Sequence, residues 1–338
     1  MKVLTCITPG DLQYGEQEKP NLTPGHAIIK IKRIGICGTD LHAFEGTQPY
    51  FSYPRILGHE LSGELVEFDN APGFTVGERV TFIPYFNCGH CIACKMKHPN
   101  ACVNIKVCGV HVDGGMVDYL SVPSASLIHG NGLSYDELAL IEPLAIGAHG
   151  VSRAGIQKDE FVLVIGAGPI GLGTMEFARI AGAKVIAMDV NAQRLQFCKD
   201  KLAIPHVVNA MDANVLEQIQ EITSGNMATV VIDATGNLKA INQGLYYLAH
   251  GGRYVLIGLQ KGDLQFNHPE FHKRETTLMS SRNALREDFD QVIAAMKLQL
   301  VQPENYITHR VNFEHLKNEM ANLLNPISGV IKAMVTIA

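Results

Sequence analysis

The strongest constraint on the fold is a glycine-rich turn that directly follows an apolar strand. Residues 161–166, FVLVIG, form a continuous apolar run, as expected of a parallel strand that is covered on both faces. Gly166, Gly168 and Gly171 come next, and a stretch with helical character runs from Ile170 to about Ala181. A strand, a turn with this glycine spacing and a helix together predict a βαβ unit.

The rest of the chain divides into regions with different predicted secondary structure. Before about residue 140 it predicts an irregular β region with short strands between turns rich in glycine and proline. Its clearest strands are residues 26–36 and 77–83. The middle alternates strands at 183–189, 228–235 and 252–258 with helices such as 192–202. This alternation predicts a doubly wound parallel sheet and an α/β fold. Two helices, at about 287–300 and 313–324, and a strand at 329–337 are expected at the end.

Length and charge restrict the possible functions. A chain of 338 residues usually forms two domains, and 46% hydrophobic against 18% charged residues predicts a soluble globular protein. The net charge of −5, without blocks of like charge, argues against a nucleic-acid or anionic-membrane partner. The N-terminal segment lacks the apolar core of a signal peptide, because it is interrupted by Pro9, Gly10, Asp11 and Glu16. No apolar run reaches membrane-spanning length. A cytoplasmic location is therefore expected.

The glycine turn predicts a dinucleotide site. Gly166 permits a tight turn, Gly168 lets the backbone approach a pyrophosphate, and Gly171 allows close packing of helix and strand. By itself this pattern also occurs in ordinary strand-to-helix turns. Asp189 strengthens the prediction because it lies 23 residues after Gly166, at the end of the next strand. There a carboxylate can bind the adenosine ribose and repel the 2′-phosphate of NADP, which favours NAD. The alternative for Asp189 is a solvated strand end or a helix cap.

Four of the eight cysteines form a compact cluster. Cys88, Cys91, Cys94 and Cys102 fall within fifteen residues, and in a reducing compartment such clustering indicates metal rather than disulfides. Four soft ligands at this spacing suit a closed, structural tetrahedral zinc site. A redox-active pair and an iron–sulfur cluster are the alternatives, but the βαβ context of a thioredoxin-like pair is absent here.

A second metal site needs residues that lie far apart in the sequence. Cys37, His59 with Glu60, and Glu142 offer a thiolate, an imidazole and carboxylates, which could bind zinc and leave one position open. Spacing alone cannot show that they meet. Taken singly, Cys37 is more often a small buried hydrophobe, His59 a structural histidine and Glu142 a carboxylate at a helix start.

The ordered motifs GICGTDLH, GHE, CxxCxxCx₇C, EPLAIGAH and VIGAGPIGLG resemble the zinc-containing medium-chain dehydrogenases over essentially the whole chain. Glu142 followed by Pro143 resembles the sorbitol and threonine dehydrogenase branch, since alcohol dehydrogenases have cysteine at that position. Residues 251–284 are similar to bacterial hexonate 5-dehydrogenases, which act on L-galactonate or L-gulonate. The resemblance implies a chaperonin-10-like catalytic domain formed by residues 1–145 and 285–338, around a Rossmann domain at 146–284.

The resemblance also implies the roles of the metal-site residues. A catalytic zinc would be bound by Cys37, His59 and Glu60, with Glu142 as a ligand or an exchanging neighbour. Asp40 would accept a hydrogen bond from the far nitrogen of His59. Thr39 and His42 match the family's proton relay, so both are expected to be catalytic together with Glu142. One departure from the family pattern is Lys97, where many relatives have glycine in the cysteine loop.

Cofactor, substrate and assembly follow from the same resemblance. NAD and two zinc ions per chain are expected, with Pro169, Ile170 and Arg194 as further cofactor contacts. Arg282 is the candidate for the substrate carboxylate, because a guanidinium fork suits that group, although it could pair with a surface acid or the cofactor instead. His111 either lines the pocket or packs in the core. The family usually forms dimers or tetramers, so a homo-oligomer is expected.

These observations predict zinc-dependent oxidation of a secondary alcohol on a sugar acid or polyol, with hydride transfer to NAD. An L-galactonate or L-gulonate 5-dehydrogenase activity is favoured. Sorbitol, galactitol-phosphate and L-threonine dehydrogenases are the rival enzymes. In a different class, the chain could be a catalytically silent NAD-binding regulatory relative. This alternative is disfavoured because a protein without catalytic activity would not need a metal site. The complete set of candidate ligands is present: Cys37, His59, Glu60 and Glu142.

Overall fold

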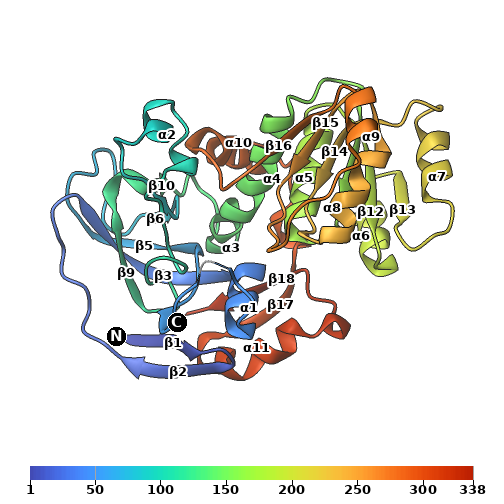
Figure 1. Cartoon of the computed structure of the whole chain (residues 1–338). Coiled ribbons are helices and arrows are strands. Elements are labelled where there is room, and N and C mark those ends of the chain that lie inside the picture. Colours follow the sequence, from blue (N-terminus) through green and yellow to red (C-terminus); the bar gives the residue numbers. More distant parts are fainter. Residues whose placement is uncertain (50, 338) are drawn as a thin grey trace. The chain divides into compact units, whose positions relative to one another are not determined.

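The structure is a computed structural model that describes residues 1–49 and 51–337. The chain forms two compact units, Met1–Glu142 together with Leu285–Ala338, and Pro143–Ala284. The sequence colours of Figure 1 show the same division, because the red C-terminal segment joins the unit that the blue N-terminal segment begins. One unit is dominated by β-structure and the other alternates strands and helices, so the expected α/β class is confirmed.

The second unit contains a six-stranded parallel sheet. Its order is β13-β12-β11-β14-β15-β16, in which β11 is central and pairs in register with both β12 and β14. The apolar run that begins at Phe161 forms β11, and four of its five residues are buried, as a strand covered on both faces requires. The strands are β11 Phe161–Ile165, β12 Lys184–Asp189, β13 His206–Asn209, β14 Ala228–Asp233, β15 Leu248–Leu256 and β16 Thr277–Ser280.

Helices connect these strands by crossovers. The strand order runs outward from β11 in one direction through β12 and β13, and in the other through β14, β15 and β16. Right-handed crossovers in opposite directions place helices on both faces of the sheet, which is the doubly wound Rossmann arrangement. α4, Ile141–Ala154, precedes β11, and the connecting helices are α5 Pro169–Ile180, α6 Ala192–Leu202, α7 Val215–Ile222, α8 Leu238–Gly244 and α9 His268–Lys273.

The first unit is built on a seven-stranded sheet. Its path is β10-β6-β5-β3-β18-β17, and β9 pairs with β3. A three-stranded sheet, β2-β1-β4, and a two-stranded ribbon, β7-β8, complete the β-structure. The strands are β1 Lys2–Thr8, β2 Asp11–Glu16, β3 His26–Ile36, β4 Arg55–Ile56, β5 Glu60–Phe68, β6 Arg79–Phe82, β7 Tyr85–Phe86, β8 Lys106–Val107, β9 Tyr119–Pro123, β10 Leu127–His129, β17 Ile307–Asn312 and β18 Lys332–Thr336.

The last strand of the chain is an internal strand of this sheet. β18 pairs antiparallel with β3 through Ala333–Ile36 and Met334–Gly35, and parallel with β17. The core of the unit therefore includes both ends of the chain, with Ile34, Leu61 and Val335 fully buried. Its helices are α1 Gly38–Glu45, α2 Ile92–Lys95, α3 Tyr135–Ala139, α10 Arg286–Lys297 and α11 Leu316–Leu324.

Several expected element boundaries differ from the structure by a few residues; for example, the last strand is shorter than expected and spans Lys332–Thr336. The helix expected from Phe313 starts as a 3₁₀ turn at Phe313–His315, and α11 begins only at Leu316. The strand expected from Gly252 begins earlier, at Leu248, because an irregularity in its pairing with β14 lets the chain continue through Gly251, which has a φ of 73°. Among the described residues, no helix is both long and apolar enough to cross a membrane.

The glycine turn provides a test of the packing in the second unit. A Cβ atom at Gly171 would collide with the carbonyl oxygen of Gly166, which is backbone and cannot move aside. At Gly168, a Cβ would meet only Arg194, with 3.8 Å to Nη1. We expect Gly171→Ala to cost about 3 kcal/mol of stability through overpacking. The matched Gly168→Ala variant should lose less than about 1 kcal/mol, as a poorer helix N-cap. Calorimetric unfolding measures both, and equal unfolding temperatures would contradict this packing.

Candidate metal and nucleotide sites

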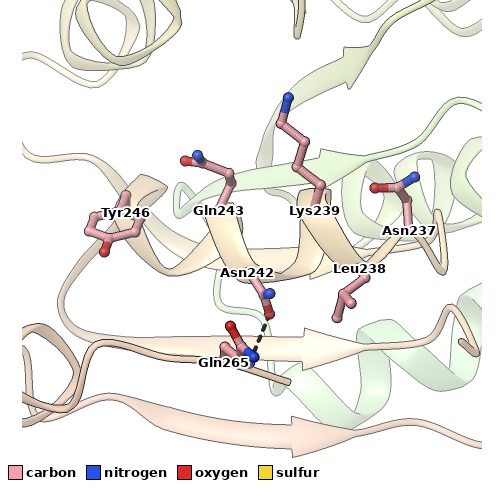
Figure 2. A pocket seen from close by; sticks show the side chains of 7 residues that line it. All are labelled: Asn237, Leu238, Lys239, Asn242, Gln243, Tyr246 and Gln265. Atoms are coloured by element: carbon pink, nitrogen blue, oxygen red, sulfur yellow. Dashed lines mark hydrogen bonds between the residues drawn. The ribbon is translucent and has the colours of Figure 1, made fainter. Parts of the chain in front are cut away.

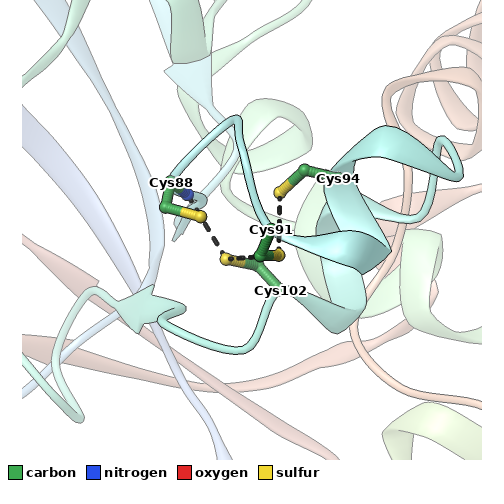
Figure 3. Close-up of side chains that lie close together, drawn as sticks. All are labelled: Cys88, Cys91, Cys94 and Cys102. Carbon is green, nitrogen blue, oxygen red and sulfur yellow. Dashed lines mark hydrogen bonds between the residues drawn. The ribbon is translucent and has the colours of Figure 1, made fainter.

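The four clustered cysteines meet in one loop, as Figure 3 shows. The sulfur atoms of Cys91 and Cys94 lie 3.5 Å apart, and those of Cys91 and Cys102 lie 3.8 Å apart. With zinc–sulfur bonds of about 2.3 Å, the edge of a tetrahedron of thiolates measures about 3.8 Å. These separations are far too long for disulfide bonds of about 2.05 Å. The geometry therefore fits one tetrahedral metal ion.

The thiols of this loop differ in acidity, because burial raises the pKa of Cys102 to about 11. Backbone N–H groups lower the pKa of Cys91 to about 6, so that its thiolate form is accessible near neutral pH. The loop turns after α2 at Lys97, whose φ is 62°. This is the left-handed region in which glycine is usual, and a side chain there costs about 1 kcal/mol. The structure thus keeps a glycine-like backbone at the position where the sequence departs from the family pattern.

A second cluster joins Cys37, His59 and Glu60. Their ligand atoms all lie within 4.8 Å of one another, although the residues come from different parts of the first unit. Cys37 lies between β3 and α1, where it is the N-cap residue of the helix, and Glu60 begins β5 directly after His59. His59 and Glu60 are buried, and Cys37 is half-buried. The sheet therefore brings together three residues whose proximity the sequence spacing could not show.

Asp40 stabilises this cluster differently from the expectation. Its carboxylate accepts hydrogen bonds from the backbone N–H groups of Cys37, at 2.9 Å, and Gly58, at 3.0 Å. The expected hydrogen bond to the ring of His59 is not formed, because Nδ1 lies 3.8 Å from the Asp40 carboxylate and has no hydrogen-bond partner. Asp40 thus holds the backbone N–H of Cys37 and that of Gly58, the residue before His59. Its carboxylate lies 3.8 Å from Nδ1 of the His59 ring.

Sequence reasoning missed Lys332, which forms a buried ion pair with Glu60. Its ammonium group lies 2.6 Å from both carboxylate oxygens of Glu60, and Lys332 and Glu60 are 2% and 0% exposed. Gly35 makes room for this pair, since a Cβ there would collide with Glu60 Oε2. Lys332 and Gly35 could have been noticed in the sequence. A lysine in an apolar strand and a glycine within a strand each indicate a special position.

Glu142 lies beside the cluster rather than in it. It interacts electrostatically with His59, Glu60 and Lys332, but its carboxylate is not part of the group whose ligand atoms lie within 4.8 Å. Its Oε1 atom instead accepts a hydrogen bond from the phenol of Tyr85 in β7. Tyr85 was also missed by the sequence reasoning, and nothing in the sequence distinguishes it from a core aromatic residue.

The electrostatics of the cluster favour a bound divalent cation. Burial raises the pKa of Glu142 to about 7, and it also raises the pKa of Asp40. Burial alone would lower the pKa of His59, but Cys37 and Asp40 raise it well above its usual value. Several acidic groups thus share a buried volume with two basic groups, the ammonium of Lys332 and the imidazole of His59. Zinc would balance this charge, and the thiolate, imidazole and carboxylate match its ligand preferences.

Thr39 and His42 lie on α1, immediately after Cys37. They are three residues apart and therefore on the same side of the helix. Thr39 is half-buried and His42 is exposed to solvent.

The glycine turn has a geometry that suits a pyrophosphate. Gly166 adopts a φ of 102°, and Gly168 is the N-cap residue of α5, which begins with Pro169 and Ile170. The space beside Gly168 is open except for the guanidinium group of Arg194. The free N–H groups and positive dipole of a helix N-terminus are attractive to phosphates, and Arg194 would add a positive charge.

Asp189 ends β12 beside this turn. One carboxylate oxygen accepts a hydrogen bond from Ala167 N at 2.6 Å, and the other accepts one from Asn191 N at 2.8 Å. The carboxylate is therefore oriented by the turn itself, and each oxygen has a further lone pair for a ligand hydroxyl.

The remaining candidates lie on the surface. Arg282 is exposed in the loop after β16, within the second unit. His111 is exposed as well, and its Nδ1 atom accepts a hydrogen bond from Val107 N at 3.1 Å. The expectation of a packed core histidine was therefore wrong, because the side chain closes a surface turn after β8.

A separate hollow of about 580 Å³ opens on the surface of α8 (Figure 2). In Figure 2, amide side chains dominate its lining, and Gln265 N donates a hydrogen bond to Asn242 Oδ1 at 3.1 Å. No residue singled out from the sequence lines it. Its lining contains no candidate acid–base pair or metal-ligand group, so the chemistry is assigned to the clusters described above.

Known protein families match both parts of the chain. Residues 23–131 match the alcohol dehydrogenase GroES-like domain, and residues 169–297 match the zinc-binding dehydrogenase domain. The chain is 44% identical to L-galactonate-5-dehydrogenase of Escherichia coli (strain K12), over 98% of both proteins. It is 33% identical to sorbitol dehydrogenase of Halalkalibacterium halodurans, over 91% of this chain and 92% of that protein.

The fold is also similar to solved structures. A short chain alcohol dehydrogenase from E. coli CFT073, complexed with the cofactor NADH, superimposes with a TM-score of 0.92 at 30% identity. The match covers 100% of this chain and 99% of that chain. Family domains, full-length relatives and fold agree, and the chain belongs to the zinc-binding dehydrogenases whose first domain is GroES-like.

Proposed function

We propose that the protein is a zinc-dependent, NAD-linked dehydrogenase that oxidises a secondary alcohol on a sugar acid. The observation that carries this proposal is the buried group of Cys37, His59 and Glu60, which suits a metal ion with an open position. The substrate class rests on the 44% identity to L-galactonate-5-dehydrogenase. L-galactonate and L-gulonate are therefore the favoured substrates.

In this proposal, Cys37, His59 and Glu60 hold the catalytic zinc, and Cys88, Cys91, Cys94 and Cys102 hold a structural one. A zinc ion with an open position supplies a Lewis acid that lowers the pKa of a substrate hydroxyl. Lys332 keeps Glu60 in place and offsets part of the negative charge around the ion. The buried surroundings exclude water, which strengthens each of these electrostatic interactions.

The chain's own residues then remove the proton and orient the reactants. Thr39 would take up the hydroxyl proton and pass its own proton on toward His42, and exposed His42 would release a proton to solvent. Glu142 is the acidic neighbour that exchanges with the ligands of the ion. The hydride goes to NAD, because the cofactor performs the redox chemistry and the protein positions it.

NAD binds at the carboxyl edge of the parallel sheet in this proposal. Asp189 binds the adenosine ribose. The pyrophosphate is surrounded by the residues of the glycine turn and its neighbours, Gly166, Gly168, Pro169, Ile170, Gly171 and Arg194. A second negative charge from a 2′-phosphate would be repelled by Asp189, so NAD is preferred over NADP. Arg282 binds the substrate carboxylate through its guanidinium fork. The protein works in the cytoplasm as a homo-oligomer, as is usual in the family.

The direct test follows NAD and NADP reduction with L-galactonate, L-gulonate, sorbitol, galactitol 1-phosphate and L-threonine. We expect the highest kcat/KM with a hexonate and a lower KM for NAD than for NADP. If the protein oxidised only a neutral polyol or only threonine, the proposed sugar-acid substrate class would be wrong. The absence of turnover with all five would favour the silent regulatory relative, and a lower KM for NADP would refute the role of Asp189.

Arg282→Ala tests the carboxylate contact separately. Loss of a charge-assisted, two-point hydrogen bond should lower kcat/KM for the hexonate by about 10- to 100-fold, since such bonds contribute roughly 1.5–3 kcal/mol. Turnover of sorbitol, which has no carboxylate, should change little, and Arg282→Lys should recover only part of the loss. Equal losses on both substrates would remove this assignment.

A further inference from the structure

Tyr85 is the one buried phenol that contacts an acidic group of the candidate metal site among the described residues. Its hydroxyl donates a hydrogen bond to Glu142 Oε1, and the two residues are 7% and 5% exposed. A hydrogen bond between two buried groups is costly to break, because neither partner can turn to water instead. The position of the Glu142 carboxylate therefore depends on that of Tyr85.

Tyr85 itself is rigidly held. Its ring makes an edge contact with Phe289 of α10, with 6.3 Å between the ring centroids and an interplanar angle of 71°. Its backbone pairs with Val107 in the β7-β8 ribbon, and Pro84 O accepts a hydrogen bond from Cys108 N at 2.9 Å. A residue fixed by ring packing and by a strand ladder can hold a carboxylate in one place.

The ribbon that holds Tyr85 is also the base of the cysteine loop. β7 ends two residues before Cys88, and β8 begins four residues after Cys102. A metal ion bound by the four cysteines would fix both ends of this loop. The placement of Tyr85, and with it that of Glu142, would then rest on the structural ion as well as on the ribbon.

We propose that Tyr85 is a positioning residue that occupies one oxygen of Glu142 and so limits this carboxylate to a one-oxygen approach to the catalytic ion. The inference rests on the proposed function of the cluster formed by Cys37, His59 and Glu60. A carboxylate that bound zinc through both oxygens would fill the position that the substrate hydroxyl needs. With Oε1 held by Tyr85, only Oε2 of Glu142 would remain for the ion, and the position for the substrate hydroxyl would stay available.

Tyr85→Phe is the sharpest test, because it removes only the hydroxyl and keeps the ring against Phe289. The matched control is Tyr254→Phe, which removes a buried hydroxyl that donates to Ile241 O at 2.8 Å in the second unit. Both variants are loaded with cobalt in place of zinc, and their visible spectra are recorded without substrate. Subtracting the wild-type spectrum cancels the contribution of the four-cysteine site, which neither variant alters.

We expect a distinct difference spectrum for Tyr85→Phe, from a changed coordination of cobalt, and a flat one for Tyr254→Phe. Both metal ions should remain bound, while kcat/KM falls by about 10- to 100-fold, the usual effect of losing such an outer partner. Adding Tyr85→Phe to Glu142→Ala should change the spectrum no further. A flat difference spectrum for Tyr85→Phe, loss of its ion, or an additional effect in the Glu142→Ala background would overturn the proposal.

Failure of the proposed function gives a different result. In that case, wild-type protein and Cys37→Ser protein would have the same cobalt spectrum, because no ion would bind at Cys37. If the two spectra differ but Tyr85→Phe has no effect, the metal site stands and only the role of Tyr85 is wrong.

Discussion

The buried ion pair between Lys332 and Glu60 is the interaction on which the rest of the structure depends. An unpaired charge in a protein interior is very costly, and removing one partner of a buried pair typically destabilises a protein by about 3–5 kcal/mol. Here the ammonium of Lys332 also interacts electrostatically with Cys37 and Glu142, so one lysine faces several acidic groups. This imbalance is a physical reason for a divalent cation in the same place, and it distinguishes the cluster from an ordinary buried salt bridge.

The same pair explains the course of the chain. Lys332 lies on β18, the last strand, and Glu60 lies on β5, and both strands flank β3 in one sheet. The chain must therefore leave the first unit, form the complete Rossmann unit, and return to finish the sheet around the metal cluster. The ion pair of Lys332 with Glu60 therefore requires the C-terminal strand, whereas Cys37, His59 and Glu60 come from the directly paired strands β3 and β5 and the residues beside them.

The sequence predicted well what depends on local pattern. The alternation of apolar strands and helices, the glycine turn and the cysteine spacing each lie within a short segment, and residues 192–202 form the expected helix. It predicted poorly what depends on the meeting of distant strands. Spacing could not show that Cys37 lies near His59, and it gave no indication that Tyr85 contacts Glu142. The carboxylate of Asp40 was assigned to a ring nitrogen, but two backbone N–H groups compete for it successfully.

The central claim is that the cluster around Lys332 and Glu60 holds a metal ion in addition to the one in the cysteine loop. Diffraction from crystals of the purified protein, measured on both sides of the zinc absorption edge, locates zinc directly. Two anomalous peaks are expected in each chain, one among the four clustered sulfurs and one between Cys37 Sγ, the ring of His59 and the carboxylate of Glu60. A single peak, confined to the cysteine loop, would contradict it.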